Sequence, residues 1–239
     1  MKIQKFKKHW DANSLDFAKK FGDFNRLLND LILLSEDTGK QFSGAKKPLE
    51  NTTFLLLGKS INHILSSQIL LEKGLLIDAA LSTRNALETL LLLQAILLDP
   101  EEKHADQWLN GKQFKPSWDR KRLEKVQEVT VRDVIVNASD DVNQMAYSWL
   151  SDITHANLSS FSYSMNMTGN NSYEVHIGGS IKGHDTAIKA IYAVLLFTLH
   201  QATVLSACVL CLKWFESKSE LFKKIQNNIN EITKHNKAN

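Results

Sequence analysis

The 239-residue chain has few of the residues that interrupt helices, with only three prolines and ten glycines. Proteins built from many short strands and tight turns use more of both, because turns need these residues at fixed positions. A strong charge of one sign is also absent, since 29 basic and 26 acidic side chains leave a formal net charge of +3. The composition therefore predicts long helices joined by few turns, and it excludes a surface coated in basic charge.

Cysteine is scarce as well, with Cys208 and Cys211 as the two instances. Their C-x-x-C spacing lies inside an apolar segment, and no second pair exists that could complete a zinc site. The histidines are scattered without a metal-binding spacing. We therefore expect two core cysteines, no metal and no cofactor. Because the basic N-terminus is not followed by an apolar signal segment, we also expect a cytoplasmic protein.

The apolar residues of the first third recur at the three- and four-residue spacing of amphipathic helices, starting near Asp11. Gly74 fits the position just past a helix that covers about residues 53–72, and Asp99-Pro100 is typical of a helix start. The expected fold is all-α, a single helical bundle domain over residues 11–239 with a small β-hairpin. Residues 1–10 are expected to form a basic, flexible N-terminus.

Two segments, Leu75–Leu98 and Ala190–Leu212, are apolar on nearly every side. Only helices at the centre of a bundle tolerate this pattern, so we expect the two to be buried against each other. The second segment is long enough to span a membrane, but His200 and Gln201 lie at its centre. This polarity favours a buried helix of a soluble bundle, without membrane association.

One stretch shows the alternation typical of strands. Residues 173–177 and 180–182 flank Gly178-Gly179, a combination that predicts a hairpin. The Ser- and Asn-rich segment before it, residues 157–172, is expected to be irregular.

Two polar pairs could carry chemistry. Arg84 and Glu88 are four residues apart, as are Ser151 and His155, so each pair lies on one face of a helix. If the two helices meet, His155 could act as a general base while Arg84 holds a phosphate and Glu88 orients one of them. The alternative is structural: the Arg-Glu pair locks the bundle and His155 caps its helix.

A basic segment follows the helix that is predicted to start at Asp99-Pro100. It is a candidate nucleic-acid contact, and the alternative is an ordinary solvated face. Its members are Lys112, Lys115, Arg120, Lys121 and Arg122.

Three motifs carry a resemblance to a known family: Arg84-Asn-Ala-Leu-Glu88, Leu98-Asp-Pro-Glu-Glu-Lys-His104, and the segment from Tyr147 to Ala156 with its Ser-x-x-x-His spacing. Over about residues 55–215 the chain resembles a bacterial helical family of uncharacterised function. That family is distantly similar to HEPN-type bundles, which include metal-independent ribonucleases of toxin and phage-defence systems. The resemblance implies a nucleic-acid-related or defence role and a homodimer.

The chain departs from the HEPN pattern, which places an Arg and a His four to six residues apart on one helix. No such spacing occurs here, so a composite of Arg84 and His155 would be required. Two function classes therefore remain open. One is RNA cleavage without metal; the other is a non-enzymatic helical binding or regulatory protein, with RNA or another protein as the partner.

Overall fold

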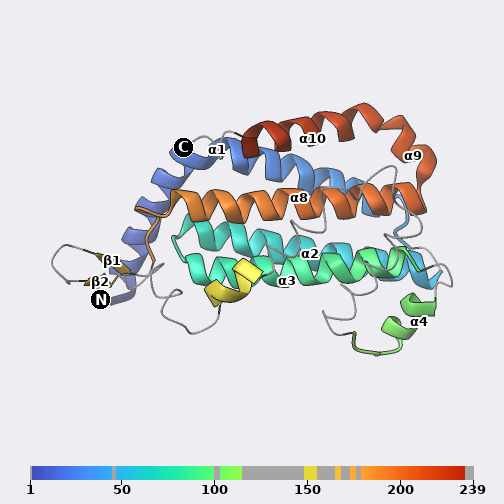
Figure 1. Cartoon of the computed structure of the whole chain (residues 1–239), viewed down its shortest axis with the longest axis horizontal. Helices are drawn as coiled ribbons and strands as arrows, with labels where there is room; N and C mark the ends of the chain where they lie inside the picture. The colour runs from blue at the N-terminus through green and yellow to red at the C-terminus, as the bar shows by residue number, and fades with distance from the viewer. Residues whose placement is uncertain are drawn as a thin grey trace.

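The computed structural model describes residues 2–44, 47–99, 103–114, 148–154, 165–167, 173–175 and 179–234. These residues form an all-α bundle, as predicted, in which long helices run side by side (Figure 1). The elements are α1 (Lys2–Lys40), α2 (Pro48–Glu72), α3 (Leu76–Leu97), α4 (Lys103–Leu109), β1 (Met165–Met167), β2 (Tyr173–Val175), α8 (Asp185–Leu210), α9 (Leu212–Ser217) and α10 (Ser219–Lys234). Residues 148–154 form a further short helix.

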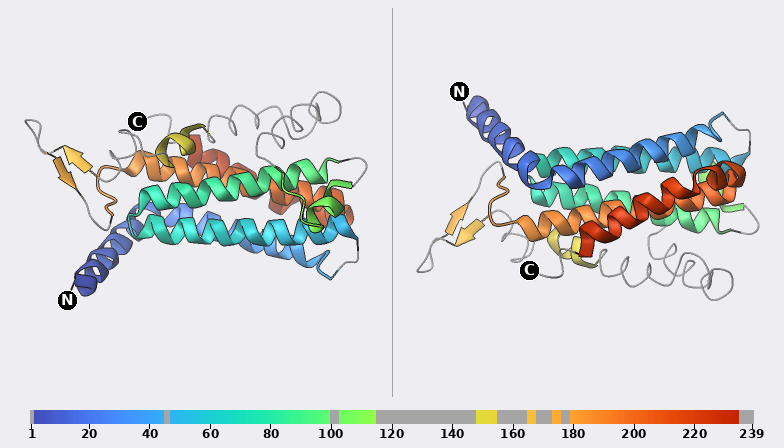
Figure 2. Two further views of the ribbon diagram at one scale, coloured as in Figure 1. Left: turned by 90° about the horizontal axis from the view of Figure 1, so that it is seen from below. Right: turned by 90° about the horizontal axis from the view of Figure 1, so that it is seen from above.

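The core lies where α3 and α8 pack against each other, which confirms the contact predicted for the two most apolar segments. α3 buries Leu87, Leu90 and Leu93, and α8 buries Leu196 and Leu199 opposite them in the same cluster. Burying such a side chain contributes about 1.5–3 kcal/mol relative to leaving it in water. α2 packs along α3, and α1 packs on α2 and α8 (Figure 2).

α1 begins earlier and ends later than the predicted helix. It starts at Lys2, so the residues expected to form a flexible terminus are helical from there. Phe6 stacks on Trp10, and His9 Nε2 hydrogen-bonds to the Gly179 carbonyl at 2.6 Å, which ties this part of the helix to the loop before α8. A kink at Phe21 (φ −123°, ψ 16°) divides α1 into two segments.

The turn between α2 and α3 is closed by Gly74 in the left-handed conformation (φ +77°). Gly74 N–H bonds to the Leu71 carbonyl and Leu75 N–H to the Leu70 carbonyl, both at 2.9 Å, which is the hydrogen-bond pattern of a Schellman cap. The predicted position of Gly74 just past the helix is therefore confirmed.

The predicted hairpin is wrong in its pairing. Residues 180–182 form no strand; instead Ser180 N–H bonds to the Gly74 carbonyl at 3.1 Å, which draws this segment onto the helix turn. The three-residue strand β2 pairs antiparallel with β1, in the segment expected to be irregular, with Asn166 opposite Glu174. Alternation alone marked one strand but could not identify its partner.

The sequence predicts a long apolar helix from His184-Asp185 to about Phe215, whereas α8 ends at Leu210. Cys211 (φ −146°, ψ 52°) separates it from α9 and α10. α10 returns along α8 and α1 (Figure 1). By length and composition, α2 and α8 could each cross a membrane, but 44% and 56% of their most apolar windows are buried inside the bundle.

Candidate functional site

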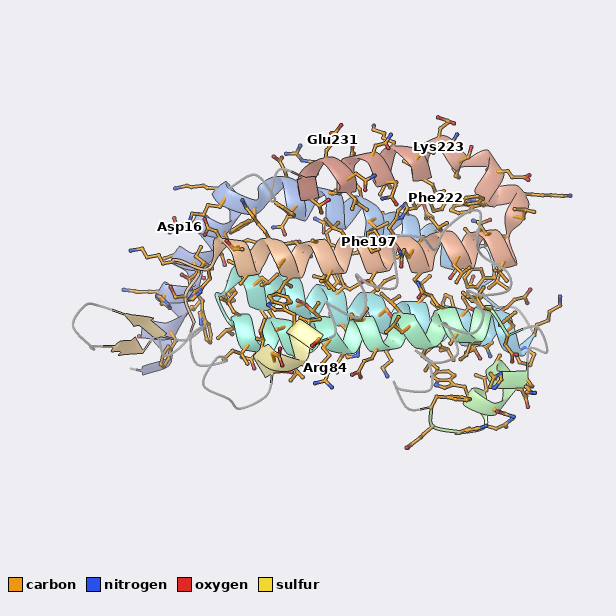
Figure 3. The ribbon with its side chains drawn as sticks, viewed as in Figure 1. Asp16, Arg84, Phe197, Phe222, Lys223 and Glu231 are labelled. Atoms are coloured by element: carbon orange, nitrogen blue, oxygen red, sulfur yellow. The ribbon has the colours of Figure 1, made fainter. Side chains whose placement is uncertain are left out.

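Arg84 lies on the side of α3 that faces residues 148–154 (Figure 3), and Glu88 follows it one helical turn later. Arg84 Nε donates to Glu88 Oε1 at 3.1 Å, across one helical turn. The two side chains are 23% and 27% exposed, so the ion pair lies at the edge of the bundle and is partly desolvated. A pair in this position is stronger than a surface ion pair, because water screens it less.

The same guanidinium reaches the neighbouring helix. Arg84 Nη1 donates to Thr154 Oγ1 at 3.3 Å, while Thr154 Oγ1 lies 2.9 Å from the Leu150 carbonyl oxygen. The hydroxyl proton of Thr154 can therefore go to its own helix backbone, which leaves an oxygen lone pair to accept from Arg84. Arg84 thus joins α3 to residues 148–154 through one side chain.

Ser151 lies one turn before Thr154, within the same short helix. Its Oγ is buried and has no hydrogen-bond partner among the described residues. A buried hydroxyl without a partner is uncommon and costs free energy, so its presence here needs a reason. We name Arg84, Glu88, Ser151 and Thr154 together the polar junction.

The polar junction combines a permanent cation, a carboxylate and two hydroxyls. Such a set can bind an anionic group or hold two helices together. Among the described residues, no group of three or more His, Cys, Asp or Glu side chains could hold a metal ion.

The structure brings some of the predicted site residues together and leaves one outside the described residues. Arg84 and Glu88 contact each other, and Ser151 lies in the helix that Arg84 contacts. His155, the predicted general base, lies outside the described residues. Sequence reasoning missed Thr154, although it is three residues from Ser151 and so shares its helix face.

Of the basic segment proposed to contact nucleic acid, only Lys112 is described. Its Nζ donates to Gln107 Oε1 at 2.7 Å and lies 5.2 Å from the centroid of the Phe114 ring. The other four members, Lys115, Arg120, Lys121 and Arg122, lie outside the described residues.

A second buried polar pair lies at the start of α4. Asp99 Oδ2 accepts a hydrogen bond from the backbone N–H of His104 at 3.0 Å and also contacts its Nδ1. Asp99 and His104 are 4% and 8% exposed, and Thr52 Oγ1 of α2 bonds to the next carbonyl, that of Ala105. Asp99 was predicted as the residue that caps this helix, and its contact with the His104 ring fixes the imidazole orientation as well.

A third polar cluster crosses the bundle near its kinked end. Asn25 Oδ1 accepts from both Tyr192 Oη and Gln68 Nε2, and Asn25 Nδ2 lies 3.4 Å from Glu72 Oε1. Burial raises the pKa of the Tyr192 phenol, with the Glu72 carboxylate as the smaller cause, so Tyr192 stays a neutral donor. This cluster ties α1, α2 and α8 together.

Comparison with known proteins adds one finding. Residues 50–144 match a family described as a family of unknown function (DUF5677), a segment that includes α2, α3 and α4. Arg84, Glu88, Asp99 and His104 fall inside this match, and Ser151 and Thr154 fall after it. No curated protein and no solved structure matches the chain. The chain is thus similar, over residues 50–144, to an uncharacterised family, as the sequence led us to expect.

Proposed function

We propose that this protein is a non-enzymatic helical binding or regulatory protein, in which the polar junction holds residues 148–154 on α3. The observation that carries this proposal is the engagement of Arg84 by protein groups on two sides. Its Nε contacts Glu88 and its Nη1 contacts Thr154. A guanidinium that is fixed in this way contributes to packing and register between two helices.

The test compares the stability of Arg84→Ala with that of His155→Ala in thermal and urea unfolding. Arg84→Ala leaves Glu88 partly buried without its cation, and we expect a loss of about 1–3 kcal/mol, between the values for surface and fully buried pairs. On this proposal the loss in Arg84→Ala exceeds the loss in His155→Ala, because Arg84 is the side chain that contacts both Glu88 and Thr154. Unchanged stability in Arg84→Ala would contradict the structural role.

A second function has one observation in its favour. Among the described residues, the buried Ser151 Oγ has no hydrogen-bond partner, and it lies in the helix that Arg84 contacts, so an anionic ligand oxygen could supply the missing partner. On this proposal the protein takes part in RNA metabolism or defence, cleaving phosphodiester bonds without metal. Arg84 would hold the phosphate and His155 would remove a proton from the attacking hydroxyl.

The two proposed functions predict opposite results in an RNA cleavage assay. Incubation of structured and single-stranded RNA with the wild-type protein in EDTA should give no cleavage if the first proposal holds. Cleavage that disappears in His155→Ala, with the fold of that variant intact by circular dichroism, would overturn the first proposal and support the second. The resemblance to HEPN-type proteins is the reason for choosing RNA as the substrate in this assay.

A further inference from the structure

α2 exposes an unusually apolar face to solvent. Phe54, Leu55, Leu65 and Ile69 are 42%, 46%, 37% and 57% exposed. The solvent side of an amphipathic helix normally carries charged residues. From residue 51 to residue 69, however, the exposed positions contain one charged side chain, Lys59. We define the α2 face as Asn51, Phe54, Leu55, Gly58, Lys59, Asn62, Leu65, Ser66 and Ile69.

Gly58 lies in the middle of this face. No contact within the single chain requires a glycine at this position. A glycine inside a helix is destabilising relative to alanine, because it loses more backbone freedom on folding. A Cβ added at Gly58 would meet nothing within 4 Å, and its φ is not positive. The position therefore suits a second surface that approaches the helix closely. It borders a hollow of about 360 Å³ between α1 and α2, lined in part by Gly39 and Phe54.

Two pairs of residues on the α2 face are symmetric about Asn62. Leu55 and Ile69 lie seven residues before and after it, and Gly58 and Ser66 lie four residues before and after it. An antiparallel copy of the helix, related by a two-fold axis at Asn62, would place an apolar residue opposite an apolar one and a small residue opposite a small one. Asn62 would meet the same amide of the copy.

Five positions of the α2 face also lie on one seam. Leu55, Gly58, Asn62, Leu65 and Ile69 follow the alternating three- and four-residue spacing of helices that pair along a seam. In the antiparallel copy, Lys59 falls opposite Leu65, where its aliphatic stem can cover apolar surface while the ammonium stays in water. No like charges are brought face to face along the seam.

We propose that the α2 face is a self-association surface, where two copies of this protein pack α2 against α2 in antiparallel orientation about an axis at Asn62. The same patch on both copies forms a closed two-fold contact. Figure 2 shows α2 at the margin of the bundle, beside α3 and α1. The α2 face is separate from the polar junction, whose members lie on α3 and in residues 148–154.

The strip is about 27 Å long, at 1.5 Å per helical residue. A contact of two helices lies at the small end of stable interfaces, so we expect a dissociation constant of about 10 μM. Sedimentation velocity on the full chain between about 1 and 200 μM should show a monomer converting to a dimer.

Leu55→Glu and Ile69→Lys should each weaken dimerisation by about tenfold or more, because each buries a charge against an apolar partner. Leu33→Glu is the matched control, since Leu33 is 59% exposed on α1, outside the α2 face. An equimolar mixture of Leu55→Glu and Ile69→Lys should recover a dimer, because the axis places the new glutamate opposite the new lysine.

A cysteine variant tests the axis without adding a charge. In a background with Cys208→Ser and Cys211→Ser, Asn62→Cys should form a disulfide-linked dimer under mild oxidation. Asn29→Cys, an exposed position on α1, should not form one. If Leu55→Glu loses its helical circular dichroism, the Asn62→Cys variant decides whether the α2 face forms the dimer.

Three results would overturn the proposal. One is a wild-type protein that stays monomeric at the highest concentration. Another is a dimer that Leu55→Glu, Ile69→Lys and Leu33→Glu leave equally stable. The third is binding of the monomer to phosphatidylcholine vesicles that Leu55→Glu abolishes, which would assign the α2 face to a lipid surface, as the hydropathy of α2 alone would allow.

Discussion

At the residue scale, Gly179 occupies a position where no other residue fits. Its φ is +87°, and a Cβ added there would lie 2.5 Å from the Gly74 carbonyl oxygen. Neither the backbone conformation nor the contact can be relieved by a side-chain rotation, because the backbone of residue 179 sets the position of its Cβ and the Gly74 oxygen belongs to the main chain.

We predict that Gly179→Ala lowers the free energy of unfolding by about 3 kcal/mol or more, the sum of conformational strain and overpacking. Gly111→Ala is the matched control: its φ is also +87°, but an added Cβ meets nothing within 4 Å. It should cost only about 1 kcal/mol, the strain of the left-handed conformation. Equal losses in urea unfolding of the two variants would show that the contact with Gly74 is unimportant.

Ser151 gives a second prediction at this scale. Because its buried Oγ lacks a partner among the described residues, Ser151→Ala removes a desolvated hydroxyl without breaking a hydrogen bond. The variant should be as stable as the wild type or more stable by up to about 1 kcal/mol in thermal unfolding. A loss of similar size would mean that the hydroxyl has a partner in solution.

Single residues were predictable where local chemistry decides their role. Gly74 follows an apolar helical segment, so its place past the end of α2 could be inferred from sequence. Its close contact with Gly179 could not, because two glycines far apart in the chain carry no pattern that pairs them. Thr154 was missed for the same reason: its partner Arg84 is 70 residues away.

At the element scale, α8 and α10 meet at His200. Its Nε2 lies 3.4 Å from the Phe222 carbonyl oxygen, and its ring packs edge-on against the Phe222 ring. Burial lowers the pKa of His200 from 6.5, and the hydrogen bond to Phe222 offsets part of this effect. The native state therefore binds the His200 proton only at lower pH than the unfolded chain does.

This difference predicts a loss of stability in acid. As pH falls below about 6.5, the unfolded state takes up a proton that the native state still excludes, so the free energy of unfolding decreases. Between pH 7 and pH 5, His200→Gln should lose less stability than the wild type in urea unfolding. His63→Gln should reduce the pH dependence too, since burial and, to a lesser extent, Lys59 lower the pKa of His63. The same pH dependence in His200→Gln and wild type would refute the prediction.

Elements with strong periodicity were predicted well, and their ends less well. The apolar runs of α3 and α8 correctly predicted that both segments are helices and that both are largely buried. The break at Cys211 was missed because the apolar pattern continues through it, and the helical start of α1 was missed because its anchors, such as the His9 contact with Gly179, are tertiary. β1 was missed because three residues are too few to show alternation.

At the scale of the whole molecule, three polar clusters connect helices whose packed faces are mostly apolar. Asn25 joins three helices, Asp99 with His104 fixes α4, and Arg84 joins α3 to residues 148–154. The sequence indicated Arg84 and Glu88 as a pair, since their spacing is local, but the partner helix follows only from the tertiary fold. We propose that the last of these clusters, the polar junction, holds residues 148–154 on α3.

A double-mutant cycle between Arg84 and Thr154 tests that claim most directly. Arg84→Met keeps the aliphatic stem, Thr154→Val keeps the shape without the hydroxyl, and urea unfolding of the wild type, both single variants and the double variant gives their coupling. We predict a coupling free energy of about 0.5–1.5 kcal/mol, as expected for a charge-assisted hydrogen bond in a partly buried site. A coupling indistinguishable from zero would contradict the account, because Arg84 would then stabilise nothing through Thr154.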